Sequence, residues 1–324
     1  MPLPTLNDVR PVNPVLTNLS FGFKNDKFLW DKIAPFVRED QKSGTYFIYT
    51  RDFWFRRQTG GKRAPNGPYT RADYGVSTAT YNALERGFEK SLDEPTRKAS
   101  QTPEDLQRMD VAFLTNLMQL ELEKDVAAAA FVTGVWGTST TLASTATTDA
   151  GKQWSDFNNS DPIQAAKIAD RVIHRNTGAH PNSLFIGRLA WESLSEHPLI
   201  LEKYKYTQKG IMTPELVAAV LNPSQSESME ITVGDTVENT AADGQTFVGA
   251  DVWTDSALFV VRNNPALGVA NGAYTFIWDE KGHVPWAVDE YRDDKIRANV
   301  SRVFTHYDIK IVSAQHGYIY LDCN

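Results

Sequence analysis

The chain has 324 residues, of which 41% are hydrophobic and 23% charged, and its formal net charge is −7. This is the composition of an ordinary globular protein, and it excludes disorder of the whole chain. The acidic balance also argues against tight, general binding of nucleic acid. No apolar run reaches the ~18–20 residues of a membrane span, and the start MPLPTLNDVRP lacks the parts of a signal peptide, so no membrane association is expected.

Residues 1–44 are predicted to form an extended arm. Four prolines occupy positions 2, 4, 11 and 14, and proline removes backbone donors and blocks helix formation. Only a short helix around Phe28–Ile33 is expected. The arm has too little apolar sequence for a core of its own, so it must lie on another surface.

Residues 45–91 are predicted to form an extended loop built as a β-hairpin. Tyr46–Phe55 is rich in aromatic residues, Gly60–Pro68 in turn residues, and Ala72–Asn82 in Thr, Val and Tyr. Between residues 51 and 71 there are six basic side chains and one acidic one, a net charge of +5. Because a lone hairpin is only marginally stable, this one needs an apolar surface, which another copy of the chain can provide. The charge indicates either a solvated loop or an arm that seeks an acidic surface.

The clearest element is a helix over residues 102–133. Thr102 suits the N-cap and Pro103 the first turn. An apolar stripe is expected to bury one face of the helix, formed by Leu106, Met109, Phe113, Leu117 and Leu120. At ~1.5 Å per residue the helix would be ~45 Å long, so we interpret it as a structural spine rather than a coiled coil. The small, polar residues of 134–160 indicate a surface loop.

Residues 161–270 alternate between helix and strand patterns. Helices are predicted from 162, 188 and 214, and strands at 182–187, 229–233 and 257–261. From residue 273 onward the pattern is that of strands, at 273–278, 298–304, 309–313 and 318–321. The fold class is therefore predicted to be α+β.

No motif of a catalytic or cofactor site is present. The sequence lacks GxxxxGK[ST], GxGxxG, GxSxG and HExxH, and its six histidines never lie three or four residues apart. The single cysteine, Cys323, excludes an internal disulfide. Asp293-Asp294 is interpreted as a charged turn rather than an acid–base pair. We therefore expect no enzyme, no cofactor and no metal site.

The order of these parts resembles the major capsid proteins of tailed bacteriophages, whose fold is of the Hong Kong ninety-seven type. The resemblance covers essentially the whole chain. The stretches that carry it are Leu120–Glu123, Trp154–Asp156, Ser160–Pro162, Thr177–Asn182, His197–Ile200, Lys203–Gln208, Asp293–Ile296 and Gly317-Tyr318.

The resemblance implies a layout of domains. Residues 1–44 would be the N-terminal arm, 45–91 the extended loop, 92–160 the peripheral domain with the spine helix at 102–133, and 161–270 the axial domain. Residues 271–324 would add strands that complete the peripheral domain, unless the last strand returns to the axial domain.

The resemblance also implies a structural function. The subunits would self-assemble into hexamers and pentamers of an icosahedral shell that encloses double-stranded DNA without sequence-specific binding. Assembly would take place in the bacterial host cytoplasm, and the mature subunit would be found in the virion. The implied partners are other copies, a portal and, in some shells, a decoration protein. The founding member of the fold begins with a scaffold-like segment that is cut away. Because the arm here begins close to Met1, we expect a separate scaffolding protein, or none. Lys62 lies in the loop that is crosslinked in the founding member of the fold, but its partner residue has no match, so crosslinking is not expected.

Charge then suggests a contact between subunits. The four basic loop residues expected to reach a neighbour are Arg56, Arg57, Lys62 and Arg63, and the possible acidic partner surface is Glu121, Glu123 and Asp125 of its spine helix. Two alternatives remain open. The same fold could form a protein nanocompartment with enzyme cargo, or the eight Trp and twelve Tyr residues could serve a carbohydrate-binding protein.

Overall fold

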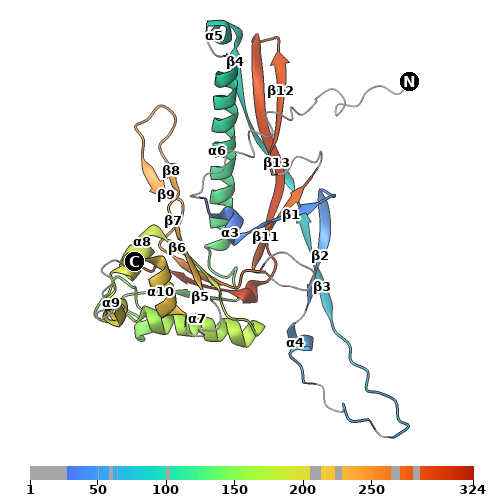
Figure 1. Ribbon diagram of the computed structural model, residues 1–324, viewed down its shortest axis with the longest axis vertical. Coiled ribbons are helices and arrows are strands. Elements are labelled where there is room, and N and C mark those ends of the chain that lie inside the picture. The colour runs from blue at the N-terminus through green and yellow to red at the C-terminus, as the bar shows by residue number, and fades with distance from the viewer. Residues whose placement is uncertain are drawn as a thin grey trace.

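The computed structural model describes residues 28–49, 51–57, 61–63, 65–99, 103–204, 213–222, 228–263, 271–279 and 285–324. These residues form two units, each built on a five-stranded sheet, and a hairpin that projects away from both (Figure 1). The predicted arm is described from Phe28 onward, and its residues 1–27 lie outside the described residues. None of the described helices combines the length and the apolar composition needed to cross a membrane.

The first unit packs one long helix against a sheet. The helix, α6 (Pro103–Ala130), is the predicted spine, and it follows the short helix α5 (Glu94–Ala99). The sheet has the order β1 (Phe36–Glu39), β11 (Ala273–Trp278), β13 (Ala298–Ile311) and β12 (Ala287–Asp293), with β4 (Leu84–Asp93) also paired to β13. β4 thus continues from the hairpin into the body, alongside α6 and β13 (Figure 1).

The face of α6 that is buried is not the one predicted. The core side chains of the helix are Val111, Leu114, Met118, Leu122 and Val126. On the predicted stripe, Met109 is 68% and Phe113 is 52% exposed, and Leu117 and Leu120 are only partly buried. The prediction failed because the helix is apolar on two faces, and helical spacing alone cannot say which face meets the core.

The described end of the arm lies on its own subunit. The helix α3 (Trp30–Ile33) is buried between α6 and the sheet, and β1 continues from it as a strand parallel to β11. The Trp30 ring packs 4.5 Å from Phe36 and 6.3 Å from Trp286, measured between ring centroids. The surface on which this part of the arm lies is therefore intramolecular.

The second unit has a mixed sheet covered by helices. The strand order is β5 (Thr138–Thr141), β14 (Gly317–Leu321), β10 (Ala257–Val260), β6 (Ser183–Gly187) and β7 (Glu230–Gly234). Its helices are α7 (Pro162–Thr177), α8 (Arg188–Ser195), α9 (Pro198–Tyr204) and α10 (Pro214–Leu221), with two short turns, η1 (Asp149–Gly151) and η2 (Ala314–His316). β8 (Val237–Asn239) and β9 (Gly249–Asp251) form a small separate ribbon. The final strand, β14, thus belongs to this sheet and not to the first.

Residues 134–160 are not the surface loop that the sequence predicted. They contain β5, which pairs in parallel with β14, and they bury the Trp136 and Trp154 side chains. The Trp154 ring packs 6.1 Å from that of Tyr320 in the second core. The many small polar residues concealed these two anchors, because a sheet edge with polar side chains has the composition of a loop.

The hairpin consists of β2 (Ser43–Tyr49) and β3 (Val76–Asn82), paired antiparallel. The strand predicted to continue to Phe55 ends at Tyr49, and a single helical turn, α4 (Arg51–Trp54), follows. The second strand begins at Val76 rather than at Ala72.

The buried carboxylate of Glu123 joins three parts of the chain. It accepts hydrogen bonds from the backbone N–H groups of Leu29 and Trp30 at 2.8–2.9 Å. The Thr236 hydroxyl and the Trp253 indole N–H, both in the connection after β7, donate to Oε1 at 3.0 and 2.7 Å. Burial raises the pKa of Glu123, and these donors oppose that shift by favouring the charged form. The arm segment, the spine and the second unit therefore meet at one side chain.

Replacing this carboxylate by an amide is expected to destabilise the fold strongly. In Glu123→Gln, an NH₂ group faces N–H and O–H donors and leaves some of them without an acceptor. We expect the free energy of unfolding in urea to fall by about 2–4 kcal/mol. The control Glu192→Gln, which removes an exposed pair with Arg188, should cost at most about 1 kcal/mol. Equal costs for the two variants would contradict the role assigned to Glu123.

The buried His197 ring is held in one neutral form. The Leu199 N–H donates to Nδ1 at 3.3 Å, so Nδ1 carries no proton. Nε2–H then donates to Ser160 Oγ at 3.0 Å, and the Ser160 hydroxyl donates to the Asp156 carbonyl at 2.8 Å. Burial lowers the pKa of His197, in agreement with this chain of donors.

Stability should therefore fall in mild acid. Because the folded pKa lies below the ordinary value of 6.5, the unfolded chain binds the proton more tightly, and stability decreases as the pH drops below that value. We expect His197→Asn to be less stable than the natural chain at about pH 8 but to lose less stability between about pH 7.5 and 5.5. Urea midpoints across this range measure the difference, and identical pH slopes would refute the assignment.

Candidate functional site

The distal part of the hairpin exposes a group of aromatic side chains. More than half of the surface is exposed in each of Phe47, Trp54, Phe55, Tyr69 and Tyr74. Trp54 and Tyr74 lie together, with ring centroids 6.1 Å apart. Large exposed apolar patches mark contact surfaces in soluble proteins. This part of the chain therefore has the character of an interface.

The root of the hairpin is fixed to the body. The Tyr46 and Tyr81 rings stack on Phe276 of β11, at centroid distances of 5.3 and 4.7 Å. Arg51 donates hydrogen bonds to Asn176 at the end of α7 and to Gln315 in η2, at 2.9 and 3.2 Å. The inner aromatic residues thus find an apolar surface on their own subunit, whereas the outer ones keep more than half of their surface exposed.

The predicted basic residues lie on this projecting segment. Arg56, Arg57, Lys62 and Arg63 are all exposed. Arg63 donates to the Gly67 carbonyl and to the Tyr69 hydroxyl, and its guanidinium lies 4.7 Å from the Tyr69 ring centroid. Basic side chains and exposed aromatic rings therefore occur on the same projecting hairpin.

The predicted acidic surface is not available as predicted. Glu123 is fully buried and satisfied by its own chain, so its inclusion was wrong. Arg86 of β4 lies 2.9 Å from Glu121 Oε1 and 2.8 Å from Asp125 Oδ2, so it holds both carboxylates. Burial and the Asp125 carboxylate raise the pKa of Tyr307, whose hydroxyl donates to Asp125 at 2.8 Å. Charge on a helix predicts exposure, whereas here both carboxylates are paired with an arginine of their own subunit.

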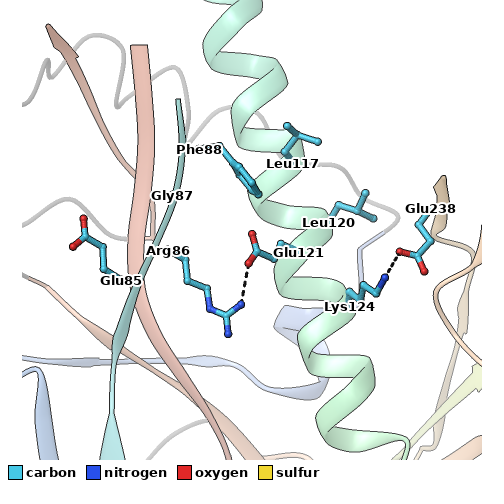
Figure 2. A pocket seen from close by; sticks show the side chains of 9 residues that line it. All are labelled: Glu85, Arg86, Gly87, Phe88, Leu117, Leu120, Glu121, Lys124 and Glu238. Atoms are coloured by element: carbon cyan, nitrogen blue, oxygen red, sulfur yellow. Dashed lines mark hydrogen bonds and ion pairs between the residues drawn. The ribbon is translucent and has the colours of Figure 1, made fainter. Parts of the chain in front are cut away.

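A groove lies beside these residues, between β4, α6 and β8. It has a volume of about 530 Å³. Figure 2 shows Phe88 of β4 reaching toward the helix, which contributes Leu117 and Leu120 to the lining. A 2.7 Å ion pair between Lys124 and Glu238 bridges the helix to β8. The groove thus combines an apolar lining with a charged rim.

Sequence reasoning missed this groove. It placed residues 84–91 in the projecting loop, whereas β4 pairs with β13 along the body. The period-two alternation that would reveal a half-buried strand is weak in Leu84–Lys90, where the glycine at position 87 replaces a side chain. Gly87 is required there, because a Cβ atom would lie 2.8 Å from the Cβ of Phe304. Among the described residues, no group of three or more His, Cys, Asp or Glu side chains is placed to hold a metal ion.

Two curated proteins are similar in sequence. The major capsid protein of Burkholderia phage BcepMu is 28% identical over 251 residues, which cover 76% of this chain and 75% of that protein. The major capsid protein of Pseudomonas phage JBD67 is 25% identical over 265 residues, covering 79% of both chains. No family model matches the sequence.

Solved structures share the fold. A phage-related protein of Bordetella bronchiseptica has a TM-score of 0.74 at 20% identity, covering 97% of this chain and 98% of its own. The mature capsid of bacteriophage PhiM1 gives 0.53 at 11%, covering 93% and 88%. An encapsulin complex from Synechococcus elongatus gives 0.55 at 9%, with the same coverage. The resemblance to major capsid proteins of tailed phages and the α+β capsid fold are therefore confirmed.

Proposed function

We propose that this chain is a structural subunit of a phage shell. Its copies would assemble into hexamers and pentamers of an icosahedral capsid around double-stranded DNA. The observation that carries the proposal is the similarity to two phage major capsid proteins over about three quarters of the chain, 76% and 79%. The capsid-type fold and the projecting hairpin support it. In this layout the first unit is the peripheral domain, the second the axial domain, and the hairpin of β2 and β3 with the residues between them the extended loop.

Self-association gives the hairpin the surface that it lacks. Its outer aromatic residues are exposed in the single chain, and repeated contacts between identical subunits close into a shell when their geometry fixes the curvature. The net charge of −7 suits a container for DNA, because strong binding of phosphate would hinder movement of the genome. The subunit would act in the virion after assembly in the host cytoplasm, with a separate scaffolding protein, a portal and, optionally, a decoration protein as further partners.

The groove of Figure 2 is the receiving surface that we propose for the hairpin of a neighbouring copy. Its apolar lining of Phe88, Leu117 and Leu120 matches the aromatic rings of the hairpin. The rim keeps a net negative charge that can attract the basic residues in place of the buried Glu123, because among the described residues three carboxylates, those of Glu121, Asp125 and Glu238, face only the cations of Arg86 and Lys124. Exposed ion pairs contribute only ~0–1 kcal/mol each, so the apolar contact should supply most of the affinity and the charges the orientation.

Reversing the charge of the hairpin should impair assembly. Changing Arg56, Arg57, Lys62 and Arg63 to Glu replaces attraction by repulsion at each copy of the contact. We expect few or no shells by negative-stain electron microscopy, with the thermal midpoint of the soluble subunit unchanged, because these side chains are exposed. The matched control R56K/R57K/R63K keeps the charge and should assemble normally. Normal shells from the reversed variant would refute the role of charge.

A charge in the groove should have the same effect from the receiving side. Phe88→Glu puts a carboxylate on the apolar lining, and we expect the yield of shells to fall at least about tenfold, the effect of ~1.4 kcal/mol at a contact. Phe88→Leu keeps the surface apolar and should assemble. Circular dichroism checks that both subunits fold, and a folded Phe88→Glu subunit that forms shells at the natural yield would exclude this groove.

The likeness to an encapsulin supports a second candidate, a nanocompartment with enzyme cargo. At 9% identity this likeness concerns the fold alone, whereas both curated relatives are phage proteins. The content of purified shells separates the two, since double-stranded DNA favours the capsid and a protein cargo the nanocompartment. A carbohydrate-binding role gains no support from these relatives, and binding of glycans by a subunit that never assembles would be needed to revive it.

A further inference from the structure

A basic pocket lies in the second unit, between α7, α9 and α10. Its volume is about 610 Å³, within the range of small-molecule sites. Lys167, Arg171 and His174 line it from α7, and Lys203 lines it from α9. Positions 167, 171 and 174 are spaced by four and three residues, so they lie on one face of the helix. The fold thus brings four basic side chains to one pocket of an acidic protein.

The positive charge of the pocket is not neutralised within the described part of the chain. Lys167, Arg171 and Lys203 form no ion pair with any described residue. The one carboxylate in the lining, Asp170, is engaged by His180, whose Nδ1 lies 2.6 Å from Oδ1. Like charges at helical spacing repel one another, so the arrangement costs stability that a bound anion would recover.

The remaining lining favours a compact ligand. Ile163, Ala219 and Val220 form apolar parts of the wall, and a less polar surround strengthens the attraction between opposite charges. Arg171 can bind phosphate oxygens in bidentate fashion, whereas Lys167 and Lys203 act as point charges. The net charge of −7 repels a long polyanion such as duplex DNA more than it repels a small one.

We propose that this pocket binds a small, free polyphosphate anion, such as inorganic triphosphate or the triphosphate group of a nucleotide. Neither the capsid role nor the contact through the hairpin requires such a site, so the inference is independent of the proposed function. The ligand would sit on α7 and cross to Lys203 of α9.

Titration calorimetry of the full-length chain with sodium triphosphate tests the proposal. We expect saturable binding, weakened about five- to tenfold by each of Arg171→Gln and Lys203→Gln, the usual effect of losing one charge-assisted hydrogen bond. Lys203→Arg keeps the charge and should bind within about twofold of the natural chain. All the changed side chains are exposed, so folding should be unaffected, and thermal midpoints without ligand verify this.

The matched control is Arg175→Gln, which removes an equal charge from an exposed position four residues further along α7 and outside the pocket. Its affinity should stay within about twofold of the natural chain. Equal weakening by Arg171→Gln and Arg175→Gln would reduce the effect to general surface charge and overturn the proposal. So would the absence of binding to the natural chain, or preferential binding of a short DNA duplex that depends on Arg171.

Discussion

The rest of the structure depends on one buried carboxyl group that is surrounded by hydrogen-bond donors. Glu123 lies in the last third of the spine helix, and its oxygens accept hydrogen bonds from segments far away in sequence, among them the backbone at Leu29 and the indole of Trp253. A buried charge without its donors costs several kcal/mol, so none of the three segments can leave while the others stay in place. The two units and the end of the arm are thereby coupled into one body.

This body gives the projecting hairpin a fixed base. The stack of Tyr46 and Tyr81 on Phe276 anchors its root, and the hydrogen bonds of Arg51 tie α4 to the second unit, so the chain beyond α4 projects from a fixed base. Inside the body, carboxylates such as Glu121 and Asp125 are matched by a cation of the same chain. Outside it, the hairpin keeps basic and aromatic side chains exposed to solvent. The side chains of the body therefore stabilise the subunit, whereas the exposed side chains of the hairpin can bind a partner.

Helices and strands could be predicted from the sequence better than the contacts that surround them. The spine helix was expected at 102–133 and runs over Pro103–Ala130, because proline and long apolar periodicity are strong local signals. β5 was hidden in a polar stretch, since its stability comes from pairing with β14, almost two hundred residues away. The sequence predicts a surface position for Glu123, because composition alone gives no sign of donors supplied by the arm and the second unit. Residues whose role depends on contacts with distant segments could not be identified from the local sequence pattern.

The second apolar face of α6 argues for burial in an assembly. A helix needs one apolar face to pack on its own sheet, and the face that includes Leu114 and Met118 already serves that purpose. On the other side, Met109 and Phe113 leave 68% and 52% of their surface exposed, although the Lys90 ammonium lies over the Phe113 ring. Exposed apolar surface promotes aggregation, so it is retained where a partner covers it. A spine with two apolar faces is the pattern of a helix that packs once in the subunit and again in the shell.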